Sequence, residues 1–385
     1  MATAPALRTV NTVRTEPLAL YIHWPFCVSK CPYCDFNSHV RDTVDQDAWR
    51  DALLADLAFE ATLMPGRTLG SIFFGGGTPS LMPPATVAAL IGAARRHWSV
   101  HDDLEITLEA NPSSVEAARF ADLAAAGVNR VSLGLQALDD GALAFLGRAH
   151  GVVEGLRALE TAQAAFARVS FDLIYARPGQ SAADWDAELT RALGFGTEHL
   201  SLYQLTIEPG TRFATLVQRG ELTPVDQDIA AELFEATRAL TAQAGLPAYE
   251  VSNHARLGAQ SRHNLTYWRY GDYVGVGPGA HGRRTGYATV RHKKPENWLS
   301  AVARNGHGIV SEDVLPERDR TVEALLMGLR LSEGVDLSRL PADALDRRAV
   351  ARLHTLGFVE HSPDRLTVTE RGMLLLDTVL SEVVA

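Results

Sequence analysis

The sequence predicts an α/β fold: a partial (β/α)6 barrel followed by a smaller α+β domain of winged-helix-like outline. Three observations lead to this prediction. Short β-rich runs alternate with helical stretches over the first 210 residues, and polar residues gather at the ends of those runs. After about residue 317, helical stretches precede a short hairpin. At 385 residues, with 46% apolar and 21% charged residues, the chain has enough apolar material for a sizeable core.

Six short runs rich in β-branched and aromatic residues have the length of buried strands. Between them lie Ala-, Leu- and Glu-rich segments with apolar residues at helical spacing, such as 49–62, 84–97 and 115–126. Regular alternation of strand and helix predicts βαβ units and a parallel sheet, and six units favour a partial TIM-type barrel over an open dinucleotide-binding fold. The predicted strands are 18–24, 71–74, 104–108, 130–135, 168–175 and 199–205.

Polar residues stand at or near the carboxyl end of each predicted strand. In α/β barrels the chemistry lies at that end, where the loops converge, so these side chains are expected to share one site. The residues in question are His23, Gly75–Thr78, Glu109, Asn111, Gln136, Asp172, Tyr175, Tyr203 and Gln204.

Beyond residue 210 the pattern changes. A long amphipathic helix is expected over 226–244, and a Gly-, Tyr- and His-rich stretch follows it. The chain is therefore divided into a disordered tail (1–16), a barrel core (17–210), a barrel extension (211–316) and a C-terminal winged-helix-like domain (317–385). That last domain has nine Lys and Arg against twelve Asp and Glu, so it is not expected to read DNA.

The charge balance excludes several classes of protein. With 36 Lys and Arg against 46 Asp and Glu the formal charge is −10, so no nucleic-acid partner is expected. No apolar run approaches the roughly 18 residues that span a bilayer. The first 16 residues lack the apolar core of a secretory signal; Arg8 and Arg14, with no acid before Glu16, give only a faint organelle-transit pattern. A cytoplasmic location is expected.

All three cysteines of the chain, Cys27, Cys31 and Cys34, lie within eight residues. Such clustering indicates a ligand site rather than unreactive core cysteines. Zinc would need a fourth ligand, which His23 or His39 could supply. A [4Fe–4S] cluster held by three cysteines would instead keep one iron open to another ligand.

The segments around the cysteines, Tyr21–Cys27 (YIHWPFC) and Lys30–Phe36 (KCPYCDF), resemble the cluster loop of radical S-adenosylmethionine (SAM) proteins. They are most similar to the branch that contains oxygen-independent coproporphyrinogen III oxidase and the haem chaperones. The resemblance extends from about residue 18 to the C-terminus.

This resemblance implies a cofactor set. Cys27, Cys31 and Cys34 would hold a [4Fe–4S] cluster whose open iron is chelated by SAM. Positions that match SAM-binding residues of the family are Tyr21, Tyr33, Gly76, Gly77, Thr78, Glu109, Gln136, Arg148 and Asp172. In the oxidase, the positions matching Gln136, Arg148 and Asp172 line a second SAM, and whether a second SAM binds here is left open.

Two features separate the oxidase from the chaperones. The oxidase has a fourth cysteine two residues after the third, where this chain has Phe36. The segment His263–Trp268 (HNLTYW) matches the HNxxYW pattern of the haem chaperones, which makes His263, Asn264, Tyr267 and Trp268 the candidate haem-binding residues. A basic run between Gly282 and Pro295 is a candidate patch for haem propionates or an acidic partner.

The leading hypothesis is a haem chaperone that passes haem to acceptor proteins such as respiratory cytochromes, without net oxidase activity. Peripheral contact with a membrane would need no spanning helix. The alternatives are the oxidase itself and a radical enzyme that acts on another substrate.

Overall fold

The computed structural model describes residues 16–41 and 43–384. The tail expected over residues 1–16 therefore lies outside the described residues except for Glu16. Within the described ranges, no helix is long and apolar enough to cross a membrane.

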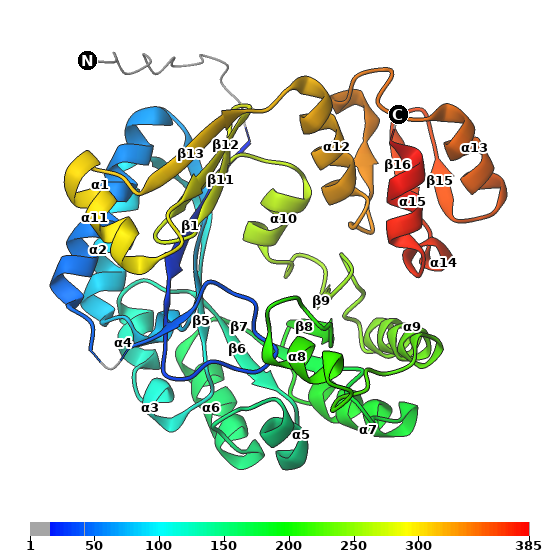
Figure 1. Cartoon of the computed structure of the whole chain (residues 1–385), viewed down its shortest axis with the longest axis horizontal. Helices are drawn as coiled ribbons and strands as arrows, with labels where there is room; N and C mark the ends of the chain where they lie inside the picture. Colours follow the sequence, from blue (N-terminus) through cyan, green and yellow to red (C-terminus); the bar gives the residue numbers. More distant parts are fainter. Residues whose placement is uncertain (1–15, 42, 385) are drawn as a thin grey trace.

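A sheet of eleven strands forms the body of the molecule, in the order β13-β12-β11-β10-β1-β4-β5-β6-β7-β8-β9. Its six parallel barrel strands coincide with the six predicted runs, so the α/β class and the barrel core are confirmed (Figure 1). These strands are β1 (Leu18–Trp24), β4 (Thr68–Gly76), β5 (Ser99–Ala110), β6 (Arg130–Gln136), β7 (Arg168–Tyr175) and β8 (His199–Gln204).

Side chains alternate along each barrel strand. On β1, Leu20 and Ile22 are fully buried in the layer between sheet and helices, whereas Tyr21 points into the barrel. The outer helices are α1 (Gln46–Leu63), α2 (Pro84–His97), α3 (Ser114–Ala117), α4 (Phe120–Ala125), α5 (Asp140–Phe145), α6 (Val152–Ala165) and α7 (Ala182–Leu193), with the short η1 (Pro79–Leu81) before α2.

The helix predicted over 115–126 is divided into α3 and α4. Between them, the guanidinium of Arg119 donates hydrogen bonds to the carbonyls of Ser80 and Met82 on the neighbouring loop. This reach across to another segment accompanies the break in the helix, which periodicity alone does not reveal.

The segment after the barrel core returns to both edges of the sheet. At one edge, β10 (Tyr273–Val276) pairs in parallel with β1, and the strands beyond it are antiparallel. At the other edge, β9 (Asn253–Ala255) lies antiparallel to β8. The other elements of this segment are α8 (Arg212–Gln218), α9 (Gln227–Gln243), α10 (Arg262–Trp268), β11 (His281–Arg284), β12 (Tyr287–Arg291), α11 (Pro295–Asn305) and β13 (Ile309–Val314).

In the basic run between Gly282 and Pro295, Lys293 and Lys294 are exposed, but the arginines are paired within the fold and do not form the expected anion patch. Arg291 contacts Asp56 at 2.7 Å and Glu60 at 2.8 Å, with all three side chains at 0% exposure. Arg284 pairs with Glu60 and Glu312, and Arg283 with Glu323. The run clamps α1 to the sheet edge and offers no free arginine cluster to an anion.

The C-terminal part has a small core of its own, built around Leu325, Val350, Leu366 and Val379. A three-stranded antiparallel sheet packs with helices there, in keeping with the predicted α+β domain (Figure 1). The closing helix is interrupted after Met373. The elements are α12 (Glu317–Gly328), β14 (Val335–Asp336), η2 (Leu337–Arg339), α13 (Arg347–Thr355), β15 (Val359–His361), β16 (Arg365–Val368), α14 (Glu370–Met373) and α15 (Leu376–Val383).

Candidate functional site

The three cysteines follow β1 on a loop at the carboxyl end of the barrel. Their thiols are free, half-buried, and line a cavity of about 480 Å³, the cluster cavity. The loop begins at β2 (Phe26–Cys27), which pairs with β3 (His39–Val40). The Thr78 hydroxyl donates to Cys27 Sγ at 3.5 Å, and Arg148 Nη1 donates to Cys31 Sγ at 3.3 Å.

Two polar side chains fix this loop to the barrel. His23 contacts the Asn37 carbonyl through Nε2 and the Tyr21 hydroxyl through Nδ1, both at 2.9 Å. The Asn37 amide donates to the carbonyls of Pro278 and Lys293 at 3.0 and 2.9 Å. The cysteine loop is therefore positioned by both the first strand and the far edge of the sheet.

The glycines after β4 are required by close packing. A Cβ atom at Gly76, where φ is +112°, would lie 2.6 to 2.8 Å from ring atoms of His23. A Cβ at Gly77 would lie 2.6 Å from the Phe26 carbonyl oxygen. Both glycines and Thr78 line the cluster cavity, so the run brings backbone close to the cysteine loop.

Two carboxylates face the cluster cavity from neighbouring strands of the barrel. Burial, followed by repulsion from Asp172, raises the pKa of Glu109 to about 8. Burial likewise raises the pKa of Asp172 to about 6. Glu109 accepts a hydrogen bond from the Gly76 amide at 3.3 Å, and Asp172 accepts one from Ser132 at 3.2 Å. Neither forms an ion pair in the described structure, so the two together suit a cationic ligand.

Gln136 and Arg148 complete this wall of the cavity. Gln136 has φ of +68°, a left-handed conformation that is costly for a residue with a side chain and is found most often at functional sites. Arg148 donates to Asn111 Oδ1 at 2.6 Å and to the Gly134 carbonyl at 3.1 Å. Tyr33 lies 3.5 Å from Arg148 through its hydroxyl.

Tyr21 is placed differently from the other predicted SAM residues. A Cβ atom on Gly75 would come within 2.9 Å of its ring, and its side chain does not line the cluster cavity. Its role in this structure is to hold His23, which in turn holds the cysteine loop.

A second, larger cavity of about 1040 Å³ adjoins the first; we call it the large cavity. The two share five lining residues, Tyr33, Phe36, Glu109, Gln136 and Asp172. Much of the remaining lining is apolar, from Ile174, Leu205, Phe234, Val251 and Met373–Leu376. Five acids also line the large cavity, namely Asp35, Glu109, Asp172, Glu208 and Asp377, and its single Lys or Arg is Arg330.

The His263 motif lies at the opposite end of the barrel, on α10. His263 is 1% exposed, and burial lowers its pKa to about 3, so the ring is neutral. Its Nδ1 contacts Ser71 Oγ at 2.9 Å and its Nε2 contacts the Tyr267 hydroxyl at 2.6 Å. Glu105 accepts hydrogen bonds from the backbone amides of Arg262 and His263.

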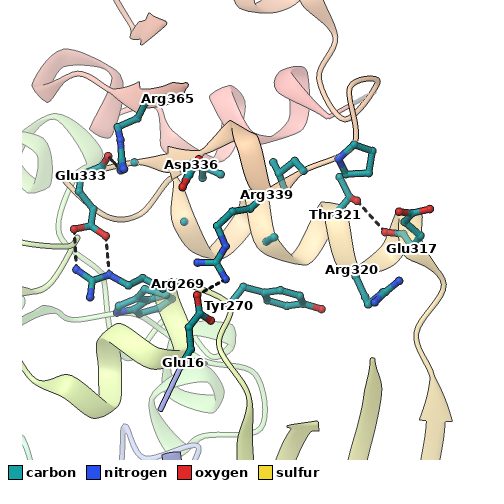
Figure 2. A pocket seen from close by; sticks show the side chains of 17 residues that line it. Glu16, Arg269, Tyr270, Glu317, Arg320, Thr321, Glu333, Asp336, Arg339 and Arg365 are labelled. Carbon is teal, nitrogen blue, oxygen red and sulfur yellow. Dashed lines mark hydrogen bonds and ion pairs between the residues drawn. The ribbon is translucent and has the colours of Figure 1, made fainter. Parts of the chain in front are cut away.

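In this arrangement both ring nitrogens of His263, a candidate haem-binding residue, are engaged within the protein and are not free for iron. Asn264 sits in the first turn of α10, where its backbone amide donates to Ser261. Trp268 lines a third, charged cavity of about 580 Å³, shown in Figure 2. A hydrogen-bonded packing histidine and an iron ligand look the same in sequence, and only the fold distinguishes them.

The cysteine end fits the predicted cofactors. Three free thiols, two unpaired acids for the cationic parts of SAM, and the buried Arg148 Nε without a hydrogen-bond partner all meet at the cluster cavity. The sequence interpretation missed Ser132 and Arg330. The alternation of Arg130, Ser132, Gly134 and Gln136 along one strand could have revealed Ser132, whereas nothing local to residue 330 marks it.

Comparisons with known proteins agree with this geometry. The Radical SAM superfamily profile matches residues 21–191, which implies a [4Fe–4S] cluster and SAM, and the HemN C-terminal domain profile matches residues 315–375. The solved coproporphyrinogen III oxidase (HemN) from Escherichia coli superposes with a TM-score of 0.80, covering 95% of this chain and 89% of that chain, at 23% identity. At that identity the likeness concerns the fold.

Full-length relatives are closer in sequence. Heme chaperone HemW of Escherichia coli is 37% identical over 96% of this chain and 98% of its own length, and HemW of Mycobacterium tuberculosis is 37% identical over 95% and 94%. Radical S-adenosyl methionine domain-containing protein 1, mitochondrial, of Bos taurus is 44% identical over 83% and 75%. The chain belongs to the radical SAM superfamily and, within it, to the HemW family.

Proposed function

We propose that this protein is a haem chaperone, which binds haem and passes it to acceptor haem proteins such as respiratory cytochromes. The observation that carries the proposal is the 37% identity to proteins of that name over nearly the full length of both chains. We place the protein in the cytoplasm, with contact to a membrane only at the surface, where membrane-bound acceptors would be met.

For the cofactors, we propose that Cys27, Cys31 and Cys34 hold the cluster. When bound, the cluster and SAM supply one-electron chemistry. The acids offer negative charge to the cationic SAM, Arg148 braces Cys31, and Tyr21 supports the loop through His23. The proposed SAM residues are Tyr21, Tyr33, Gly76, Gly77, Thr78, Glu109, Gln136, Arg148 and Asp172.

For haem, we propose the large cavity. It adjoins the cluster cavity, much of its lining is apolar, and its volume of about 1040 Å³ suits a flat macrocycle better than a small metabolite. Its walls come from each of the proposed divisions 17–210, 211–316 and 317–385, which supports treating these as three units that enclose one site. The motif residues His263, Asn264, Tyr267 and Trp268 line neither this cavity nor the cluster cavity, so we propose that they support haem binding through the fold without contacting haem.

The charge of the large cavity speaks against the oxidase. Coproporphyrinogen carries four carboxylates, and five acids with one arginine form a poor receptor for it. Haem has two carboxylates, both on one edge of the macrocycle. The opposite edge is apolar and can enter the large cavity first. Phe36, where the oxidase has a fourth cysteine, is 60% exposed and lines both cavities, so it offers an apolar contact at their junction.

The test is a haem titration of anaerobically reconstituted, cluster-loaded protein, followed at the Soret band. Ala231→Trp would fill the large cavity from α9, and Ala242→Trp on an exposed position of the same helix is the control. We expect near-stoichiometric haem binding by wild type and Ala242→Trp, and loss of binding by Ala231→Trp. Protoporphyrinogen formation from coproporphyrinogen with SAM and reductant, without haem binding, would instead establish the oxidase.

A further inference from the structure

Arg330 is a cation that lines the large cavity and lies beside an aromatic ring. It follows the C-terminus of α12, and its guanidinium carbon lies 5.1 Å from the centre of the Trp268 ring. Within the described residues its guanidinium takes part in no ion pair or hydrogen bond, and its Nε is buried without a partner. Of the residues that the structure describes, it is the one Lys or Arg that lines the large cavity.

The nearby carboxylate, Glu250, forms no direct ion pair with Arg330 in the part of the chain that the structure describes. Glu250 is 2% exposed and interacts electrostatically with Arg330, and its Oε1 accepts hydrogen bonds from the Asn253 side chain and the Ser252 amide. The acids shared with the cluster cavity, Glu109 and Asp172, line its junction with the large cavity; Arg330 does not line the cluster cavity. A guanidinium kept unpaired beside apolar side chains is costly unless a ligand supplies the anion.

We propose that Arg330 is the carboxylate anchor of the large cavity. Its guanidinium pairs with a propionate of haem, and the contact with the Trp268 ring orients the guanidinium for that pairing. The inference rests on the proposed haem-binding function and adds which residue fixes the orientation of the macrocycle. A planar guanidinium stacked on an indole keeps its N–H edge free for bidentate contact with a carboxylate.

This arrangement also gives the His263 motif a role that does not need iron ligation. His263 contacts Ser71 of β4 and so holds α10 against the barrel, and the ring of Trp268, at the end of that helix, lies beside the guanidinium of Arg330. Trp268 lines the charged cavity whereas Arg330 lines the large one, so the stacked pair lies between the two.

The charged cavity supplies a matched control. Arg320 lies on α12, ten residues before Arg330, and its side chain has no ion pair or hydrogen bond among the described residues. Figure 2 shows it in the same cavity as two ion pairs, Arg269–Glu333 and Arg339–Glu16, both at 2.7 Å. Arg320→Gln therefore removes a comparable free charge from the other cavity.

The experiment compares hemin with its dimethyl ester, in which both propionates are esterified, on the cluster-loaded full chain. Wild type should bind hemin about tenfold or more tightly than the ester, the value of one charge-assisted contact. Arg330→Gln should lose that preference by binding hemin about tenfold more weakly and the ester unchanged. Arg330→Lys should restore part of it, and Arg320→Gln should match wild type.

Equal weakening of hemin and ester by Arg330→Gln would show a packing role and overturn the anchor. So would a wild type that does not distinguish the two ligands, a result that needs no variant to fold. If Arg320→Gln is the variant that loses hemin, haem occupies the cavity of Figure 2 instead. A wild type that binds neither ligand would overturn the proposed haem function itself.

Discussion

The two ends of the barrel differ in how far their polar groups are satisfied. At the carboxyl end, three thiols are free, Glu109 and Asp172 form no direct ion pair among the described residues, and Gln136 is held in a left-handed conformation. At the amino end, His263 uses both ring nitrogens, and Glu105 accepts hydrogen bonds from the backbone of α10. Unsatisfied groups mark a place for ligands, whereas satisfied ones mark a structural plug.

The largest expected effect comes from breaking the cysteine set. Cys31→Ser should abolish [4Fe–4S] assembly, because two thiolates remain where three are proposed and serine is a poor iron ligand. Anaerobic reconstitution, iron analysis and the visible absorption of the cluster measure this. Ser29→Ala, on the exposed part of the same loop, should assemble the cluster normally. A fully loaded cluster in Cys31→Ser would refute the assignment.

The next effect concerns the acids of the carboxyl end. Glu109 has its pKa raised to about 8, so at pH 7 it is largely protonated before a cationic ligand binds. SAM affinity should therefore increase as the pH rises from about 6.5 to 8.5, as the carboxylate becomes available. Without ligand the sign is opposite: the raised pKa gives stability that is fully present below the unfolded value near 4.5 and is lost as the pH rises from there through about 8.

Glu109→Gln removes this titration. We expect SAM binding by the cluster-loaded variant to be about tenfold or more weaker at pH 8.5, and nearly independent of pH, since a neutral amide cannot meet the cation. Calorimetric titration with SAM at the two pH values measures both. An unchanged pH profile in Glu109→Gln would mean that another group, with Asp172 the first candidate, carries the dependence.

A third change tests whether His263 has a structural role at the amino end of the barrel. His263→Ala should lower the free energy of unfolding by about 2–4 kcal/mol, because it removes a buried ring and leaves Ser71 and Tyr267 without their partner. Hemin affinity of the folded variant should change less than about twofold. Urea unfolding and the Soret titration separate the two. Loss of hemin binding with unchanged stability would restore His263 as the iron ligand.

The same histidine gives a pH effect with the opposite sign to that of Glu109. Its pKa is lowered to about 3 by burial, so the neutral ring stabilises the fold above the unfolded value near 6.5, and this contribution is lost as the pH falls from there toward 3. Wild type should therefore lose more stability than His263→Ala between pH 7.5 and 5.

Sequence and structure agree best where a pattern is local. The six barrel strands follow from β-rich runs of four to eight residues, and the cysteine loop from its spacing. Predictions fail where a long-range partner decides. In the sequence, Arg291 lies in a run without acidic residues, but in the fold it pairs with Asp56 and Glu60. The ring of His263 likewise has no visible partner in the sequence, but in the fold it contacts Ser71 and Tyr267. The proposed role of Arg330 rests on its position beside Trp268 and the large cavity, which only the folded structure reveals.

The smallest effect belongs to the rim of the charged cavity. Arg339 and Glu16 form an ion pair at 2.7 Å, with side chains 44% and 42% exposed, so solvent screens most of their attraction. Arg339→Gln should change the free energy of unfolding by less than about 1 kcal/mol and leave hemin binding unchanged. Denaturant unfolding at low and at 0.5 M salt measures it, with a smaller difference expected at high salt. A larger loss of unfolding free energy, or weakened hemin binding, would mean that the charged cavity also takes part in haem binding. The two ends of the barrel would then not differ in function as proposed.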